Sequence, residues 1–353
     1  MNLNSLLRQL FFILLMTFVI NSLMIVTFAQ GFDDSEVKHI DHPEWFIESP
    51  FLDLAEDLKK AEADGKKGLM ILYTTQGCSY CDLFIRRSLG DPEIAAIVQK
   101  NFDSIGLEIF DDVEMTTPDG TITTVKQFAE KERVGFSPTL LFFGKNGLRL
   151  LHLAGYQSPQ RFKNVLDYLS DDQSQYKSLS EYLNKELIIQ AGNTSPEVDL
   201  SKAALRNDPL FEQPPYALDR SHFPAHQPLL VIFEKPSCSE CDNFHSDVLA
   251  LPDIRETLSN FEIVQLHAGD FNTPVLTPDG KRITPALWYA QASLTRVPAL
   301  LFFDERGNEV LKTDALVLHQ RMMNSLNYVL EEAYKKNWTY QRFARSKAIE
   351  KSQ

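Results

Sequence analysis

Cysteine is scarce in this sequence, and basic residues are too few to balance the acidic ones. Only four cysteines occur among the 353 residues, and they form two Cys-x-x-Cys motifs that begin at Cys78 and Cys238. Lys and Arg number 35 against 48 Asp and Glu, so the formal net charge is −13. Because phosphate backbones are bound by clustered Lys and Arg, this balance argues against a nucleic-acid partner. A nucleotide-binding fingerprint is also missing from the sequence.

The first thirty residues differ from the rest of the chain. Arg8 is followed by an apolar run over residues 10–29, which only Asn21 and Ser22 interrupt. A charged start, an apolar core and small residues near the end predict a secretory signal peptide over 1–29. An uncleaved anchor is the alternative, since the run is about long enough to span a bilayer. We favour cleavage because Asn21 and Ser22 weaken the middle of a span. Either alternative exports the remainder of the chain.

Two parts of the chain repeat each other. The matching segments are 71–84 with 231–244, 117–120 with 277–280, and 137–143 with 297–303, each pair offset by 160 residues. One constant offset indicates gene duplication, and a unit of this size is a domain rather than a solenoid repeat. We predict one domain at 42–190 and another at 215–350, joined by a proline-containing linker at 191–214.

Each unit shows the same order of predicted elements: strand, helix, strand, helix, strand, strand and helix. In the first unit the predicted elements include strands at 68–74, 103–110 and 139–143 and helices at 81–89, 123–133 and 158–170. In the second they include strands at 228–234, 261–267 and 299–303 and helices at 241–249, 284–294 and 318–334. This order predicts an α/β fold in which helices cover both faces of a mixed central sheet.

Each cysteine pair lies at a predicted strand-to-helix junction. Cys78 or Cys238 then occupies the helix N-terminus, where unpaired N–H groups and the helix dipole stabilise a thiolate. Cys81 or Cys241 follows about one turn later and can attack a mixed disulfide to close the ring. The spacing favours redox chemistry in which the disulfides are the reactive groups, with no separate cofactor and no metal.

Other interpretations of the cysteines stay open at this point. Four cysteines in two pairs could bind zinc, although each pair belongs to its own copy of the repeat. Permanent disulfides occur in exported proteins, although a bond that closes a two-residue loop gains little from loop entropy. His245, four residues after Cys241, could be a metal ligand. We favour an ordinary surface or packing histidine.

A proline precedes a strongly apolar strand in each unit, in Ser137-Pro138 and Val297-Pro298. Taken alone, such a proline is expected to be trans and to open the strand. A cis bond there would be a specified feature. The Cys-x-x-Cys motif at the same upstream separation in both copies favours the cis form.

This combination of motifs resembles the thioredoxin superfamily over roughly residues 45–190 and 210–350. The segments FEKPSCSECDNFHSDVL and PTLLFFGKNG are most similar to periplasmic SoxW-type thioredoxins of sulfur-oxidising bacteria. The fold implied is a pair of thioredoxin-like domains in tandem.

The resemblance also implies roles for individual residues. The nucleophiles would be Cys78 and Cys238, the buried resolving thiols Cys81 and Cys241, the cis prolines Pro138 and Pro298, and the substrate-pairing backbone that of Ser137 and Val297. Such pairing is β-augmentation, in which main-chain hydrogen bonds bind an extended substrate strand with little sequence preference.

The sequence departs from the family pattern around both motifs. The buried acid that the family often carries six residues before the nucleophile is replaced by Leu72 and Ile232, which removes the usual proton acceptor. Tyr80 lies between the first two cysteines and Glu240 between the second two. The negative charge of Glu240 is expected to raise the thiol pKa of the second site. We therefore expect the two sites to have different reduction potentials.

These inferences predict an exported thiol–disulfide oxidoreductase, a reductase or exchange enzyme that acts on exported proteins or small sulfur compounds. One alternative is a periplasmic isomerase or oxidase that assists folding, and another is a non-catalytic thioredoxin-fold scaffold. An exported reductase needs a membrane electron donor, and the resemblance suggests one of the DsbD or CcdA type. The expected location is the periplasm of a Gram-negative bacterium, with a tether to the inner membrane if the N-terminal segment is not cleaved.

Overall fold

The computed structural model describes residues 32–170, 179, 182 and 204–351. The segment at 1–29, predicted to be a signal peptide or anchor, lies outside the described residues, and so does most of the predicted linker at 191–214. The described residues from Asp34 to Lys351 belong to one compact unit. Within the part of the chain that the structure describes, no helix is both long and apolar enough to cross a membrane.

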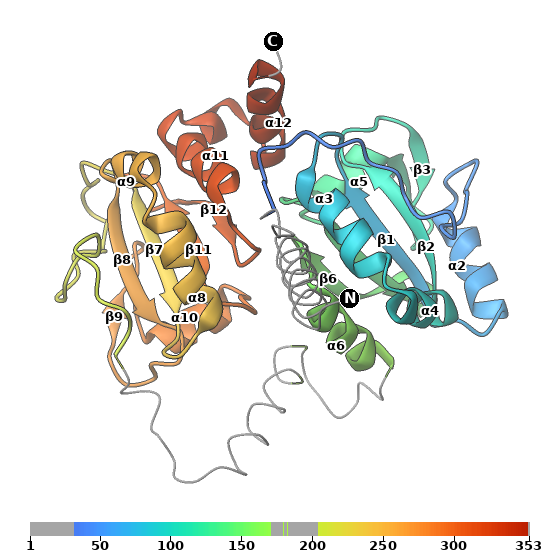
Figure 1. Cartoon of the computed structure of the whole chain (residues 1–353), viewed down its shortest axis with the longest axis horizontal. Coiled ribbons are helices and arrows are strands. Elements are labelled where there is room, and N and C mark those ends of the chain that lie inside the picture. The colour runs from blue at the N-terminus through green and yellow to red at the C-terminus, as the bar shows by residue number, and fades with distance from the viewer. Residues whose placement is uncertain (1–31, 171–178, 180–181, 183–203, 352–353) are drawn as a thin grey trace, which may run out of the picture. The chain divides into compact units, whose positions relative to one another are not determined.

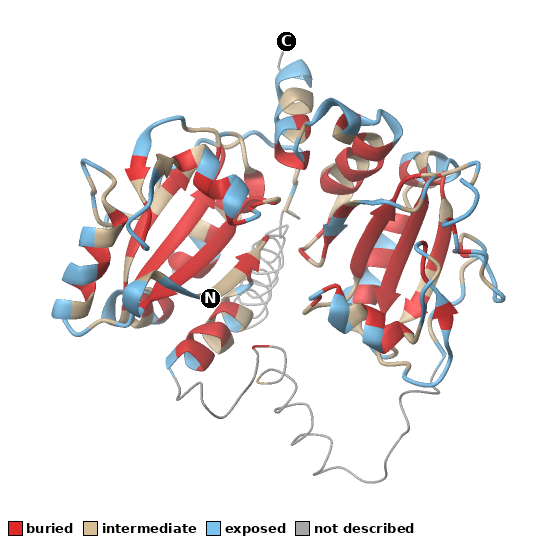
Figure 2. Ribbon diagram, turned by 180° about the vertical axis from the view of Figure 1, so that it is seen from behind, coloured by how far each residue is buried: buried red, intermediate tan, exposed pale blue. Residues whose placement is uncertain are grey.

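The first domain is built on a four-stranded mixed sheet (Figure 1). Its strands are β1 (Gly68–Thr74), β2 (Phe102–Glu108), β5 (Thr139–Gly144) and β6 (Leu148–Ala154), in the order β2-β1-β5-β6. Strand β1 runs parallel to β2 and antiparallel to β5. Every residue of β1 is buried, as expected for a central strand with both faces covered (Figure 2).

Helices cover both faces of this sheet because side chains alternate along β1. Leu72 packs with Phe84 on the face that carries α3 (Ser79–Phe84), α4 (Pro92–Asn101) and α6 (Pro159–Ser170). Tyr73 packs with Phe128 on the other face, beneath α2 (Leu54–Ala63) and α5 (Val125–Lys131). The two faces therefore bury two separate halves of the core.

The second domain repeats this arrangement. Its strands are β7 (Leu229–Glu234), β8 (Glu262–His267), β11 (Ala299–Phe303) and β12 (Glu309–Thr313), in the order β12-β11-β7-β8. Ile232 packs with Phe244 on the face of α8 (Ser239–Phe244), α9 (Pro252–Leu258) and α11 (His319–Leu330). Phe233 packs with Trp288 of α10 (Pro285–Gln291) on the opposite face. The fold class predicted from the sequence is therefore confirmed.

Some elements differ from the expected ones. The helices predicted at 81–89 and 241–249 begin as α3 and α8 and continue as π-helical turns at Ile85–Leu89 and His245–Leu249. The expected elements did not include α4, which starts with Asp91 as N-cap and a proline at its first position. The TPDG turns close two small hairpins, β3 (Glu114–Thr116) with β4 (Ile122–Thr124) and β9 (Val275–Leu276) with β10 (Arg282–Ile283). The helix α12 (Tyr340–Lys351) was also missed.

Candidate redox sites

The first cysteine pair lies where β1 ends and α3 begins. Cys78 is the N-cap of α3, and its Sγ accepts a hydrogen bond of 3.1 Å from the backbone N–H of Cys81. The two residues form a disulfide with their Cα atoms 5.3 Å apart. Cys81 is buried and Cys78 is partly exposed. The pair therefore presents one sulfur toward the outside and keeps the other inside, which disulfide exchange requires.

The second pair has the same local geometry. The Sγ of Cys238, the N-cap of α8, accepts a 3.0 Å hydrogen bond from the N–H of Cys241. The Cα atoms of this disulfide are 5.2 Å apart, and Cys241 is only 5% exposed. The preceding residue is left-handed in both copies, with φ of 85° at Gly77 and 55° at Ser237. The backbone therefore turns in the same way just before Cys78 and Cys238, and this turn places each cysteine at the start of its helix.

Both predicted prolines follow cis bonds, in Ser137–Pro138 and Val297–Pro298, so that prediction is confirmed. Strand β5 continues from the first of them and β11 from the second. Because β5 and β11 pair antiparallel with β1 and β7, each cis proline lies beside the end of the strand that leads to the cysteine turn. The structure thus brings together the residues that the sequence singled out.

Comparison with known proteins now decides the family. A family model for the thioredoxin-like domain matches residues 54–170 and 223–330, more than half of the chain. The chain belongs to the thioredoxin-like domain family. Both matched regions contain a Cys-x-x-Cys pair, and thioredoxin-like domains with such pairs support a thiol–disulfide oxidoreductase. The finer resemblance to SoxW-type thioredoxins stays a prediction.

Solved structures similar to one thioredoxin-like domain include a thioredoxin-fold protein from Helicobacter pylori, 21% identical over 35% of this chain and 82% of that one, with a TM-score of 0.30. A thioredoxin from Thermus thermophilus is 23% identical over 33% and 84%, with a TM-score of 0.27. The C-terminal domain of Neisseria meningitidis DsbD, in its reduced form, is 13% identical over 30% and 83%, with a TM-score of 0.23. None of the curated protein sequences matches the chain.

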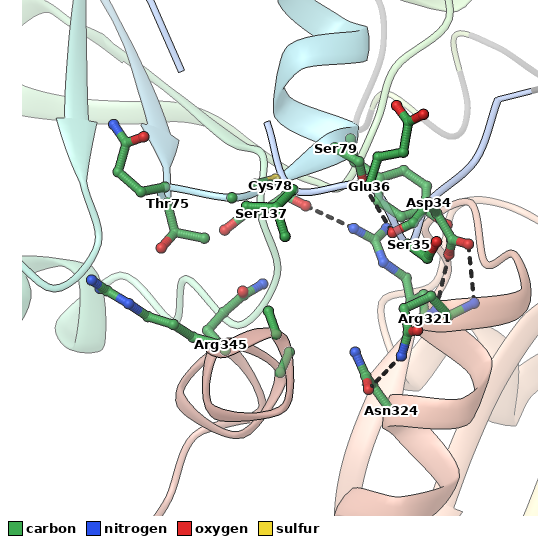
Figure 3. Close-up of a pocket in the computed structure, with 18 of the residues that line it drawn as sticks. Asp34, Ser35, Glu36, Thr75, Cys78, Ser79, Ser137, Arg321, Asn324 and Arg345 are labelled. Atoms are coloured by element: carbon green, nitrogen blue, oxygen red, sulfur yellow. Dashed lines mark hydrogen bonds between the residues drawn. The ribbon is translucent and has the colours of Figure 1, made fainter. Parts of the chain in front are cut away.

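Helix α11 covers part of the first cysteine site. The guanidinium of Arg321 lies 3.5 Å from the centroid of the Tyr80 ring, and its Nη2 donates a 2.8 Å hydrogen bond to the carbonyl of Ser137 (Figure 3). The Tyr80 hydroxyl donates to Asp34 at 2.8 Å and accepts from the N–H of Leu318 at 3.1 Å. Burial raises the pKa of Tyr80 well above its usual value, so the phenol stays neutral.

The second thioredoxin-like site is more open. Ser239 and Glu240, between its cysteines, are exposed, whereas the corresponding Ser79 and Tyr80 are each only 4% exposed. Val297 is partly exposed, as is the proline that follows it. The two copies therefore share one local geometry but differ in access.

A buried ionisable pair beneath the second site was missed by the sequence analysis. Nε2 of His245 lies 3.1 Å from Oε2 of Glu234, and Gln265 donates a 2.5 Å hydrogen bond to the same oxygen. Glu234 and His245 are 1% and 4% exposed. Glu234 points to the same sheet face as Ile232, the face that α8 covers. The second domain thus carries a buried acid two residues beyond the position where the family pattern places one.

Two sequence signals could have revealed this pair. Glu234 is a charged residue at the end of an otherwise apolar strand, and His245 follows Cys241 by one helical turn. The corresponding positions of the first copy, 160 residues earlier, are occupied by Thr74 and Ile85. Only the second copy therefore contains the pair. His245 is therefore a packed, paired histidine, and the described residues contain no cluster of three or more His, Cys, Asp or Glu that could hold a metal ion.

The H245I variant, which introduces the residue of the first copy, is expected to lower the free energy of unfolding by about 3 kcal/mol, because it removes one hydrogen-bond partner of the buried Glu234 carboxyl. The double variant E234T/H245I removes both partners and is expected to recover part of this loss. Calorimetric unfolding of the parent chain, H245I, E234T and E234T/H245I measures the coupling energy of the pair. A double variant that is less stable than H245I would contradict the inferred pairing.

Proposed function

We propose that this chain is an exported disulfide reductase or exchange enzyme, and that its second site is the one that faces protein substrates. The observation that carries the proposal is the arrangement at Cys238. Cys238 is a partly exposed residue at a helix N-terminus, its partner Cys241 is buried, and Val297-Pro298 lies beside the end of the adjoining strand. An extended substrate strand can pair with the backbone of Val297 while its disulfide meets Cys238.

The reaction begins from the dithiol form of the site. The Cys238 thiolate attacks one sulfur of a substrate disulfide, that S–S bond breaks, and a substrate thiolate leaves and takes up a proton. The Cys241 thiolate then attacks Cys238, which forms the Cys238–Cys241 disulfide and releases the second substrate thiol. Two electrons pass from the site to the substrate, and no cofactor is needed besides the disulfides themselves.

Regeneration needs a dithiol donor outside the cytoplasm. We place the protein in the periplasm of a Gram-negative bacterium, with the segment at 1–29 serving as a cleaved signal peptide or as an inner-membrane tether. A membrane donor of the DsbD or CcdA type would restore the dithiol. This part of the proposal rests on the N-terminal run and on the missing dinucleotide fingerprint.

Insulin reduction with dithiothreitol as the donor tests the proposal. We expect the chain with both sites intact and the C78S/C81S variant to reduce insulin at similar rates, and the C238S/C241S variant to be at least about tenfold slower, because the second site is exposed. A chain that reshuffles scrambled disulfides without reducing insulin would indicate an isomerase. A chain with neither activity would indicate a scaffold and contradict the proposal.

A further inference from the structure

The first site opens into a pocket beside Cys78 (Figure 3). The pocket encloses about 110 Å³. A single water needs about 10–15 Å³ of such space, so the pocket has room for a small organic group. Its walls come from residues 34–37, from the turn at residues 75–80 that contains Cys78, and from α11 and α12.

An extended peptide cannot pair with the backbone at this site in the described conformation. The carbonyl of Ser137 already accepts the hydrogen bond from Arg321, and Ser137 is only 1% exposed. Phe136, next to it, packs against Tyr340 of α12 with ring centroids 4.5 Å apart. Asp34 accepts hydrogen bonds from the N–H groups of Gln320 and Arg321, which holds the first turn of α11 in place. A substrate must therefore reach Cys78 without strand pairing.

The charges around the pocket favour an anion. Its anionic lining residues already have local partners: Asp34 accepts from Tyr80 and from α11, and Glu36 pairs with Lys38. Two cations of α12 also line it. Arg345 lies 3.7 Å from Glu108, a long separation for an ion pair, and the Lys351 ammonium contacts the side-chain oxygen of Gln320, a neutral partner.

The charged residues that line the pocket are three cations, Arg321, Arg345 and Lys351, and two anions, Asp34 and Glu36, so the lining carries a net positive charge on a chain whose net charge is −13. Positive groups in a cleft raise the local concentration of anionic substrates and speed their encounter. Arg345 and Lys351 are exposed, so their effect is expected to be moderate and to weaken as salt is added.

We propose that the first site takes a different class of substrate from the second, namely low-molecular-weight disulfides that carry carboxylates. This inference rests on the proposed function. The reduced Cys78 thiolate attacks one substrate sulfur, the S–S bond breaks, and one thiolate leaves and takes up a proton. The Cys81 thiolate then attacks Cys78, re-forms the Cys78–Cys81 disulfide and releases the second thiol. A dithiol reductant restores the site.

The test uses the C238S/C241S chain, in which only the first site reacts. The pre-reduced protein is mixed with oxidised glutathione, which is anionic, or with the neutral bis(2-hydroxyethyl) disulfide. Because the exchange releases one small thiol for each protein thiol that is oxidised, the reaction is followed by acid quenching, alkylation and counting of the thiols left on the protein. We expect oxidised glutathione to react faster. The ratio of the rate with oxidised glutathione to the rate with the neutral disulfide should fall about threefold when R345Q and K351Q are combined. In the C238S/C241S parent the same ratio should fall as salt is raised.

R342Q provides the matched control, because it removes one positive charge from the same helix at a residue that does not line the pocket. Its rate ratio should equal that of the C238S/C241S parent. An unchanged ratio in R345Q/K351Q, or equal rates for the two disulfides in the parent, would overturn the inference. If the chain with both sites intact still reduces insulin, only the substrate class fails. If it reduces no disulfide, the proposed function fails as well.

Discussion

The C241S variant is expected to retain protein partners as mixed disulfides at Cys238, with a yield at least about tenfold above that of C81S at Cys78. Removing the resolving thiol stops the second step at either site. The two sites differ because a substrate strand can reach the exposed second turn, whereas Ser137 at the first is buried and its carbonyl is occupied. Each lost backbone hydrogen bond costs about 1 kcal/mol, and about 1.4 kcal/mol is tenfold.

The measurement is non-reducing electrophoresis of exported-protein extracts after incubation with each variant, followed by release of the partners with dithiothreitol. The C238S/C241S variant controls for binding that involves no sulfur at the second site, and it should retain nothing there. Equal yields of mixed disulfide from C81S and C241S would show that the contacts of α11 with the first site do not limit the access of proteins to Cys78.

The R321A variant is expected to open the first site to protein substrates. Truncation removes the stack on Tyr80 and both carbonyl contacts, at Ser137 and at Leu316, where Nη1 donates a 2.9 Å hydrogen bond. In the C238S/C241S background we expect insulin reduction to rise about tenfold. We also expect the free energy of unfolding to fall by about 2 kcal/mol, since each hydrogen bond contributes about 1 kcal/mol.

R342A is the matched control for R321A. Arg342 also stacks on an aromatic ring, 4.7 Å from the centroid of Trp338, but it is exposed and lies outside the pocket beside Cys78. Its insulin rate should equal that of the C238S/C241S background. If R321A folds, loses stability as expected and still does not reduce insulin faster, the arginine holds the fold together without limiting access to Cys78.

These expectations give the duplicated domains unequal tasks. The second domain has an exposed turn, a partly exposed Val297 and the buried Glu234–His245 pair beneath its cysteines. The first has a pocket, a covered cis-proline backbone and no such pair, because Thr74 and Ile85 occupy the corresponding positions. Duplication retained the reactive pair in both copies, while the neighbouring side chains came to differ.

The features that depend on short-range spacing were determined by the sequence itself. A continuous apolar run predicts a buried strand, and the cysteine that follows β1 or β7 must fall at a helix start. The two X-Pro bonds, at Pro138 and Pro298, lie next to those turns because each opens the neighbouring antiparallel strand. The fold class and the positions of the two cysteine pairs needed nothing beyond these local patterns and their repetition.

Only the tertiary structure decided which side chains meet across long separations in sequence. Arg321 contacts Tyr80 and Ser137 because α11 packs against the first cysteine turn, and no periodicity in the sequence encodes that contact. Glu234 and His245 meet because the register of β7 and the helix that follows it point both inward. Spacing sets the direction of a side chain along its own element, but burial and partners depend on the packing between elements. That packing produced the difference between the two sites.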